Sequence, residues 1–143
     1  MTQKGKLWVF HEETEAQHGG EGVVRRILAY DDGMMMVENT FETGAVGALH
    51  SHPHLQTAYI AEGVFTFEID GVGKIVKKGD SVLLPCNIPH AVICHEAGVV
   101  LDVFTPMRED FEKKELPSLW TAVFLYYRSL TRSQIPLRMY LGW

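Results

Sequence analysis

The sequence predicts an all-β domain in which antiparallel strands form a sandwich or barrel. Short segments rich in β-branched and aromatic residues recur at close intervals, and turns containing glycine, proline, asparagine or aspartate separate them. No segment between residues 1 and 105 has a sustained helical periodicity. A chain of 143 residues has the length of one domain with a sizeable core.

Each strand is expected between two turn signals. Asp31, Asp32 and Gly33 separate the first pair of strands, and Asp70 with Gly71 gives the strongest short-range hairpin signal of the chain. The segment that carries His50 and His52 also looks extended. The other strands are expected over 22–30, 34–42, 56–61, 64–69, 72–76, 81–84, 91–94 and 99–104, with a turn at residues 62–63.

The end of the chain differs from this pattern. We expect a domain over 1–111 and an extension over 112–143 that is helical, with Pro117 and Ser118 at the helix start. Its apolar run is too short to span a bilayer, but it could pack on the barrel, contact a partner or lie at a membrane interface.

Composition excludes several classes of function. A net charge of -5 argues against nucleic acid as the main partner, because phosphate binding needs clustered lysine and arginine. No apolar run has the length of a membrane span. The polar N-terminus lacks the features of a secretory signal, and two cysteines do not suggest a disulfide framework. We therefore expect a cytoplasmic protein.

Three histidines have the spacing of metal ligands. His50 and His52 are two residues apart in an extended segment, so their side chains point the same way. Pro53 then favours a turn, and a hairpin would bring the amide oxygen of Gln56 back beside them. His90 follows a similar turn-strand-turn pattern and is the expected third imidazole.

Three imidazoles and one oxygen ligand suit a catalytic metal site better than a structural zinc site, which more often uses cysteines. The donor set accepts Zn, Ni, Mn or Fe, so one divalent ion of undetermined identity is predicted as the cofactor.

Two longer patterns resemble the motifs of the cupin family. Gly44, His50, His52, Gln56 and Gly63 are similar to the first cupin motif, in which glutamate usually stands at the position of Gln56. The neutral Gln56 leaves more positive charge on the metal, which favours Lewis-acid chemistry.

Residues similar to the second motif are Gly79, Pro85, Asn87, His90 and Cys94. Asn87 replaces the usual glycine, and asparagine is the best non-glycine residue for a left-handed turn. Together the motifs imply a cupin-type antiparallel β-barrel, also called a double-stranded β-helix or jelly roll.

Within the cupins, segments 45–54, 88–90 and 100–111 resemble the KdgF-type proteins of pectin and alginate breakdown. This resemblance implies an isomerase-type enzyme that converts 4,5-unsaturated monouronates, the products of polysaccharide lyases, to linear 5-keto-4-deoxyuronates. It also implies a homodimer.

The resemblance assigns catalytic roles to three residues. Asp102 lies in an otherwise apolar strand, where a carboxylate is costly unless it faces a polar pocket, and Phe104 shares its parity. Asp102 would move protons and Phe104 would shape the pocket. Arg108 would bind the uronate carboxylate through its planar guanidinium. The structural alternative is an ion pair between Asp102 and Arg108.

Two other functions fit the same motifs. A cupin dioxygenase would need a redox metal, and a sugar-binding or sensing cupin would bind metal and ligand without turnover. Among the remaining candidates, His54 is expected beside the ligands, Cys94 is expected to be a buried thiol, and Tyr59 is expected in the core.

Overall fold

The computed structural model describes residues 3–112 of the chain. Residue contacts divide the chain into two units, 1–109 and 110–143, and the first unit holds all the strands of the described region. The strands are β1 (Gln17–Gly20), β2 (Val23–Asp31), β3 (Met34–Phe41), β4 (Val46–His50), β5 (Leu55–Ile69), β6 (Val72–Lys77), β7 (Ser81–Leu84) and β8 (His90–Thr105), and a 3-10 helix, η1, spans His11–Glu13.

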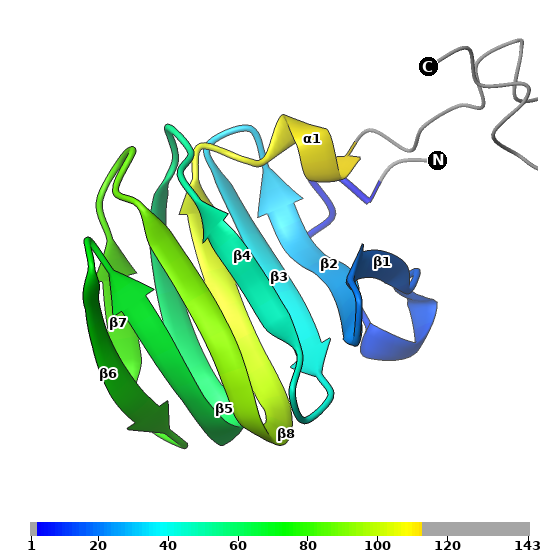
Figure 1. Cartoon of the computed structure of the whole chain (residues 1–143). Coiled ribbons are helices and arrows are strands. Elements are labelled where there is room, and N and C mark those ends of the chain that lie inside the picture. Colours follow the sequence, from blue (N-terminus) through cyan, green and yellow to red (C-terminus); the bar gives the residue numbers. More distant parts are fainter. Residues whose placement is uncertain (1–2, 113–143) are drawn as a thin grey trace, which may run out of the picture. The chain divides into compact units, whose positions relative to one another are not determined.

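Strands β5 and β8 form the centre of the fold (Figure 1). They pair antiparallel along their whole lengths, from Leu55 opposite Thr105 to Ile69 opposite His90. On the other edge of β8, the first half of β8 pairs with β4 and the second half of β8 pairs with β3. On the other edge of β5, the first half of β5 pairs with β7 and the second half of β5 pairs with β6. The two long strands are therefore shared by two curved layers, as in a jelly roll.

The turn expected at residues 62–63 is wrong, because β5 continues through it, and β8 likewise joins the segments 91–94 and 99–104. Irregular pairing at this point bends both strands. A Cβ atom on Gly98 would lie 2.1 Å from the backbone oxygen of Glu62, and Gly63 adopts a φ of 88°. Only glycine allows this close approach, so the residues that resembled a turn instead form the corner of the barrel.

The turn predictions at Asp70, Gly71 and Asn87 are confirmed. Asp70 and Gly71 have φ angles of 49° and 81° between β5 and β6, and Asn87 has a φ of 63°. These left-handed conformations are the ones that aspartate, asparagine and glycine tolerate best. Strand β1 was not predicted, because it is short and contains two glycines.

The inner face of the barrel is apolar at one end and polar at the other. Cys94 is buried in the apolar core as predicted, and burial raises the pKa of its thiol. Tyr59 is 47% exposed, so its placement in the core was wrong: it lies on the outward parity of β5. The core residues are Val23, Phe41, Ala45, Ala58, Ile60, Phe65, Phe67, Val76, Cys94 and Val100.

The predicted all-β cupin-type fold is thus confirmed, and one short helix, α1, follows the last strand at Glu109–Glu112. The helix predicted over 112–143, including its start at Pro117, lies outside the described residues, and the domain boundary at 111 stays a prediction. Within residues 3–112, no helix is long and apolar enough to cross a membrane.

Candidate metal centre and active site

Three histidines converge at the polar end of the barrel. His50 is the last residue of β4 and lies opposite His90, the first residue of β8, while His52 lies in the loop that follows β4. One ring nitrogen from each histidine lies within 4.8 Å of the others. His52 and His90 are buried and His50 is exposed. The predicted imidazole cluster is therefore present, with one side open to solvent.

Backbone carbonyl groups orient the three rings. The Nδ1 atom of His50 lies 2.7 Å from the Ala48 oxygen, and that of His90 lies 2.9 Å from the Ile88 oxygen. The Nδ1 atom of His52 lies 3.1 Å from the His54 oxygen. A carbonyl oxygen can only accept, so each Nδ1 carries the proton and each Nε2 keeps its lone pair. Metal-binding histidines are commonly oriented in this way.

Gln56 reaches the cluster by a different route from the one expected. Strand β4 pairs with β8 rather than with β5, so the predicted hairpin between the histidine segment and Gln56 is wrong. Gln56 is nevertheless buried on the inner face of β5, and its Oε1 atom lies 2.9 Å from His52 Nε2. The long-range pairing of β5 and β8 places it there.

This contact tests whether the residues fit a metal ion. The Gln56 amide nitrogen donates to Asp102, which turns Oε1 toward His52. A neutral His52 with its proton on Nδ1 then presents a lone pair to a second lone pair at 2.9 Å. A cation bound by both atoms removes this repulsion. Two ligand atoms of one metal lie about 3 Å apart when each bond is about 2.1 Å long and the angle between the bonds is close to 90°. The donor set therefore fits a metal ion.

The protonation of the rings favours the same conclusion. Burial lowers the pKa of His52 and outweighs the opposite effect of its contact with Gln56. Burial also lowers the pKa of His90, and the charges of His50 and Arg108 act in the same direction. Neutral imidazole is the form that binds metals, so these two rings are ready to bind an ion at neutral pH.

Asp102 lies directly behind Gln56 on the inner face of β8 and is only 6% exposed. Its Oδ1 atom accepts a hydrogen bond of 2.7 Å from Gln56, and its Oδ2 atom accepts one of 2.7 Å from Asn39. Burial raises the pKa of Asp102 to about 6, although the two amide donors and the charges of Arg25 and Arg108 oppose this shift. A carboxyl group with this pKa can both accept and donate a proton near neutral pH.

Asn39 was missed in the sequence. It lies on β3, where Met35, Val37 and Phe41 are buried and share its parity. A polar residue at an inward position of an otherwise apolar alternation is a signal that could have found it.

Phe104 lies beside the histidine cluster, and Arg108 lies over Phe104. Phe104 is buried, and its ring centroid lies 5.7 Å from that of His52. The Arg108 guanidinium carbon lies 5.1 Å from the centroid of the Phe104 ring, a cation-π contact. His54 packs its ring 5.5 Å from that of His52 and lies outside the cluster, as expected. The structure thus brings together all seven predicted site residues.

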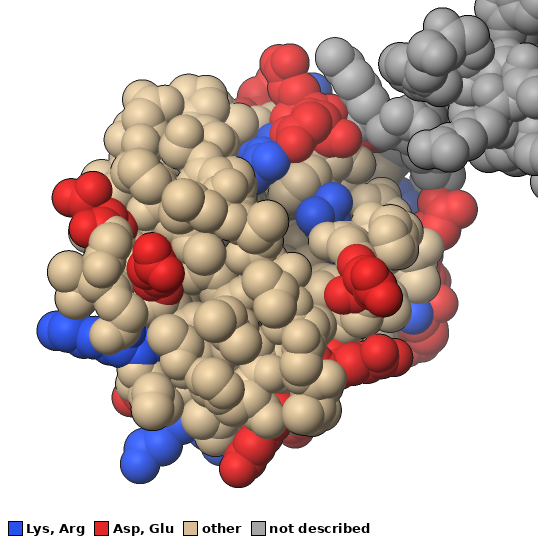
Figure 2. Space-filling model, viewed as in Figure 1, with Lys and Arg blue, Asp and Glu red and all other residues tan. Residues whose placement is uncertain are grey.

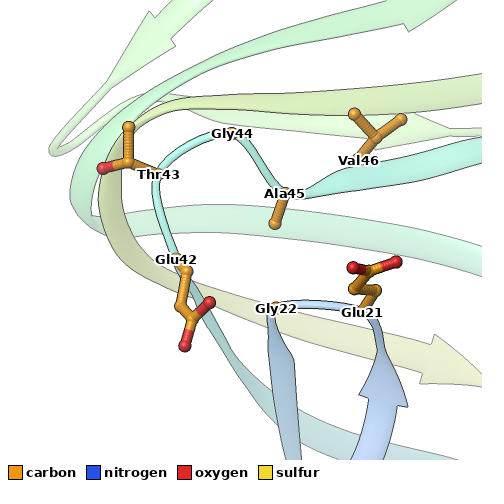
Figure 3. A pocket seen from close by; sticks show the side chains of 7 residues that line it. All are labelled: Glu21, Gly22, Glu42, Thr43, Gly44, Ala45 and Val46. Carbon is orange, nitrogen blue, oxygen red and sulfur yellow. The ribbon is translucent and has the colours of Figure 1, made fainter.

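A separate groove lies at the turn between β1 and β2 and the loop between β3 and β4 (Figure 3). It has a volume of about 440 Å³ and is lined by Glu21, Gly22, Glu42, Thr43, Gly44, Ala45 and Val46. None of the predicted site residues lines this groove.

Comparison with known proteins gives the family. The Cupin domain family matches residues 37–104. The pectin degradation protein KdgF of Dickeya dadantii is 40% identical over 108 residues, which are 74% of this chain and 98% of that protein. This chain belongs to the KdgF family of cupins.

Solved structures of similar cupins share the fold. KdgF from Halomonas sp. is 31% identical with a TM-score of 0.70, over 73% of this chain and 96% of that chain. An RmlC-like cupin from Shewanella frigidimarina is 37% identical with a TM-score of 0.74, over 77% of this chain and 99% of that chain. The present chain therefore covers nearly the full length of these three proteins.

Proposed function

We propose that this KdgF-family cupin converts 4,5-unsaturated monouronates to linear 5-keto-4-deoxyuronates. One observation carries the proposal beyond the family: a buried carboxylate, Asp102, is joined through the Gln56 amide to a three-histidine cluster that fits a metal. A proton-moving group and a site for a Lewis acid are thereby fixed side by side, which is what ring opening and tautomerisation of an enol require.

The metal would be one divalent ion, either Zn, Ni, Mn or Fe, held by His50, His52, Gln56 and His90. When bound, it would supply Lewis-acid stabilisation of the negative charge that develops on the sugar oxygens. The neutral Gln56 leaves the charge of the ion less compensated than a carboxylate ligand would.

The protein's own groups would perform the proton transfers. Asp102 accepts the proton of the anomeric hydroxyl, C1 becomes a carbonyl carbon, and the bond from C1 to the ring oxygen breaks. The ring oxygen keeps the electron pair of the broken bond and stays on C5 as an enolate. Asp102 then returns a proton to C4 while C5 becomes a ketone, so the reaction is an isomerisation without net gain or loss of atoms. Phe104 packs against the sugar ring and Arg108 binds the carboxylate.

A direct assay tests the function. Purified protein with excess zinc should accelerate the loss of the conjugated double-bond absorbance of an unsaturated monouronate over the uncatalysed rate, and a chelator should abolish the acceleration. No acceleration by the metal-loaded protein would contradict the proposal. Oxygen consumption would then indicate a dioxygenase, and ligand binding without turnover would indicate a sugar-binding cupin.

The pH dependence of kcat/KM should report Asp102. Because burial raises its pKa to about 6, the group is ionised above this pH and protonated below it. A base that must accept the anomeric proton is lost on protonation, so kcat/KM should fall about tenfold per pH unit below about pH 6. Metal content measured on the same samples provides the control. A flat profile down to pH 5 with full metal content would contradict the assignment.

Arg108 should determine substrate binding. Arg108→Ala is expected to raise KM about 10- to 100-fold, because a hydrogen bond to a charged group is worth about 1.5–3 kcal/mol. Arg108→Lys should recover only part of this loss, since an ammonium group cannot form the bidentate hydrogen bond that a guanidinium group forms with a carboxylate. Steady-state kinetics over a range of substrate concentrations measures both effects. An unchanged KM in Arg108→Ala would argue against the assignment.

The substrate could come from a pectin lyase or from an alginate lyase, and assays with the two unsaturated monouronates would distinguish these sources. We propose a cytoplasmic location, in agreement with the two free thiols of Cys86 and Cys94. We expect neither nucleic acid nor a membrane as a partner.

We also propose a homodimer, which two exposed apolar surfaces support. Leu7, Trp8 and Phe10 are 84%, 73% and 54% exposed. A second surface is a row of exposed side chains on paired strands, Val46 on β4, Ile93 on β8 and Ile75 on β6. The strands that carry this row lie at the front of Figure 1. The same view in Figure 2 shows mostly uncharged side chains over β4 and β8, and charged side chains at the edge near β6.

Light scattering on the eluting protein measures the oligomeric state. The wild-type chain should have twice the monomer mass. Trp8→Ser and Ile75→Lys should show which surface carries the contact, because only a change inside the interface should lower the mass. A wild-type mass equal to that of one chain at high concentration would contradict the homodimer.

A further inference from the structure

We propose that Asn39 is a positioning residue that fixes the Asp102 carboxylate and, through it, the Gln56 amide that faces the histidine cluster. The chain of contacts runs from β3 across β8 to β5: Asn39 Nδ2 donates to Asp102 Oδ2, and Gln56 Nε2 donates to Asp102 Oδ1, each at 2.7 Å. The inference rests on the proposed function for its effect on turnover, but not for its effect on metal binding.

The carboxylate needs such a partner. Rotation about the last bond of an aspartate side chain is only weakly restricted, so a carboxylate with one hydrogen bond can turn. Asp102 is held at both oxygens by amide groups from two different strands. Its neighbours across the strands, Val37 and Ala58, are apolar and fully buried, so they offer no side-chain hydrogen bond in place of Asn39.

The position of the carboxylate determines the orientation of the amide. Gln56 could present either its oxygen or its NH₂ group to His52, because the two ends of an amide have nearly the same shape. A negative oxygen of Asp102 can only accept, so it selects the orientation in which Gln56 Oε1 faces His52 Nε2. If Asp102 turned away, this selection would be lost and the cluster would lack a preoriented oxygen donor.

Asn39 acts only through Asp102, which gives a sharp test. Zinc titrations of chelator-treated protein by calorimetry would compare wild type, Asn39→Leu, Asp102→Ala and the double variant. Asn39→Leu keeps the branched shape and the number of heavy atoms of the side chain but has no donor, and it should weaken zinc binding about 10- to 100-fold, as is typical for residues that orient metal ligands. In the Asp102→Ala background the same change should have no further effect.

Thr40→Ala is the matched control, since Thr40 is the exposed neighbour on the same strand and should bind zinc like wild type. Unfolding temperatures identify any variant that fails to fold, and Asn39→Ser is the milder replacement in that case. Zinc affinity within twofold of wild type in a folded Asn39 variant would overturn the proposal. So would equal losses in the wild-type and Asp102→Ala backgrounds, because a general packing defect would not depend on Asp102.

Turnover provides a second, separate result. With saturating zinc, Asn39→Leu should lower kcat about 10- to 100-fold with little change in KM, because Arg108 and Phe104 still bind the substrate. If the wild-type protein fails to convert unsaturated uronates while the zinc titrations behave as expected, the proposed function is wrong and the positioning role stands. If turnover is normal in wild type and Asn39→Leu binds zinc normally, the positioning role is wrong.

Discussion

Asp102→Ala should reduce kcat/KM at least about 10³-fold, because general acid-base catalysis contributes about 10²- to 10⁴-fold and this single group would serve two proton transfers. The same change leaves the Gln56 and Asn39 amide donors without their shared acceptor. Each unsatisfied buried donor costs about 1–3 kcal/mol, so the variant should also unfold at a lower temperature. Assays at pH 7 with excess metal measure the loss of activity.

Two controls separate lost chemistry from lost metal. Metal content after loading with excess zinc should equal that of wild type, since the three histidines remain. Asp102→Asn keeps the shape of the side chain but cannot accept a proton, and its activity should be as low as that of Asp102→Ala. Activity within tenfold of wild type in either variant would rule out Asp102 as the proton-moving group.

His90→Ala should abolish both metal binding and turnover. His90 contributes one of the three clustered nitrogens from the first residue of β8, and two histidines with an amide oxygen are a much poorer donor set. A ligand present at about 1,000 times its Kd stabilises the folded state by about 4 kcal/mol. Added zinc should therefore raise the unfolding temperature of wild type by several degrees and leave that of His90→Ala unchanged.

The matched control for this variant is His95→Ala. His95 lies on the same strand, but its side chain is exposed, and its Nε2 atom forms a hydrogen bond of 2.6 Å with Thr66 Oγ1. It should keep full metal content, zinc-dependent stabilisation and activity. Full turnover by His90→Ala without bound metal would contradict a metal-dependent mechanism.

The resemblance to cupins on two spaced motifs, and the alternation of side chains within one strand, predicted most of the residues that the structure brings together around the histidine cluster. Both signals are local. Side chains of a β-strand alternate between its two faces, so Asp102 and Phe104 are predicted on one face of β8. The burial of both residues confirms this prediction. The turn chemistry of Asp70 and Asn87 is equally local, because backbone sterics at a single residue determine which side chains tolerate a left-handed φ.

Predictions that needed a partner strand were less successful. Gln56 and His52 were expected to meet through a hairpin, but they meet because β5 and β4 both pair with β8. Residues 62–63 were interpreted as a turn, yet Gly63 and Gly98 form the bend at which two long strands approach closely. A glycine permits both conformations, and only its contacts with the neighbouring strand distinguish them.

The sequence by itself therefore determined the strand-rich fold, the three imidazoles and the catalytic candidates on β8, because these depend on residue type and short spacing. Only the tertiary structure decided that Asn39 reaches Asp102 and that Asp102 turns the Gln56 oxygen toward His52. Asn39 and Asp102 are 63 positions apart in the sequence, Gln56 and Asp102 are 46 positions apart, and His52 and Gln56 are four positions apart. The two long-range contacts arise from the antiparallel pairing of β3, β8 and β5, a register that no short segment of the chain contains.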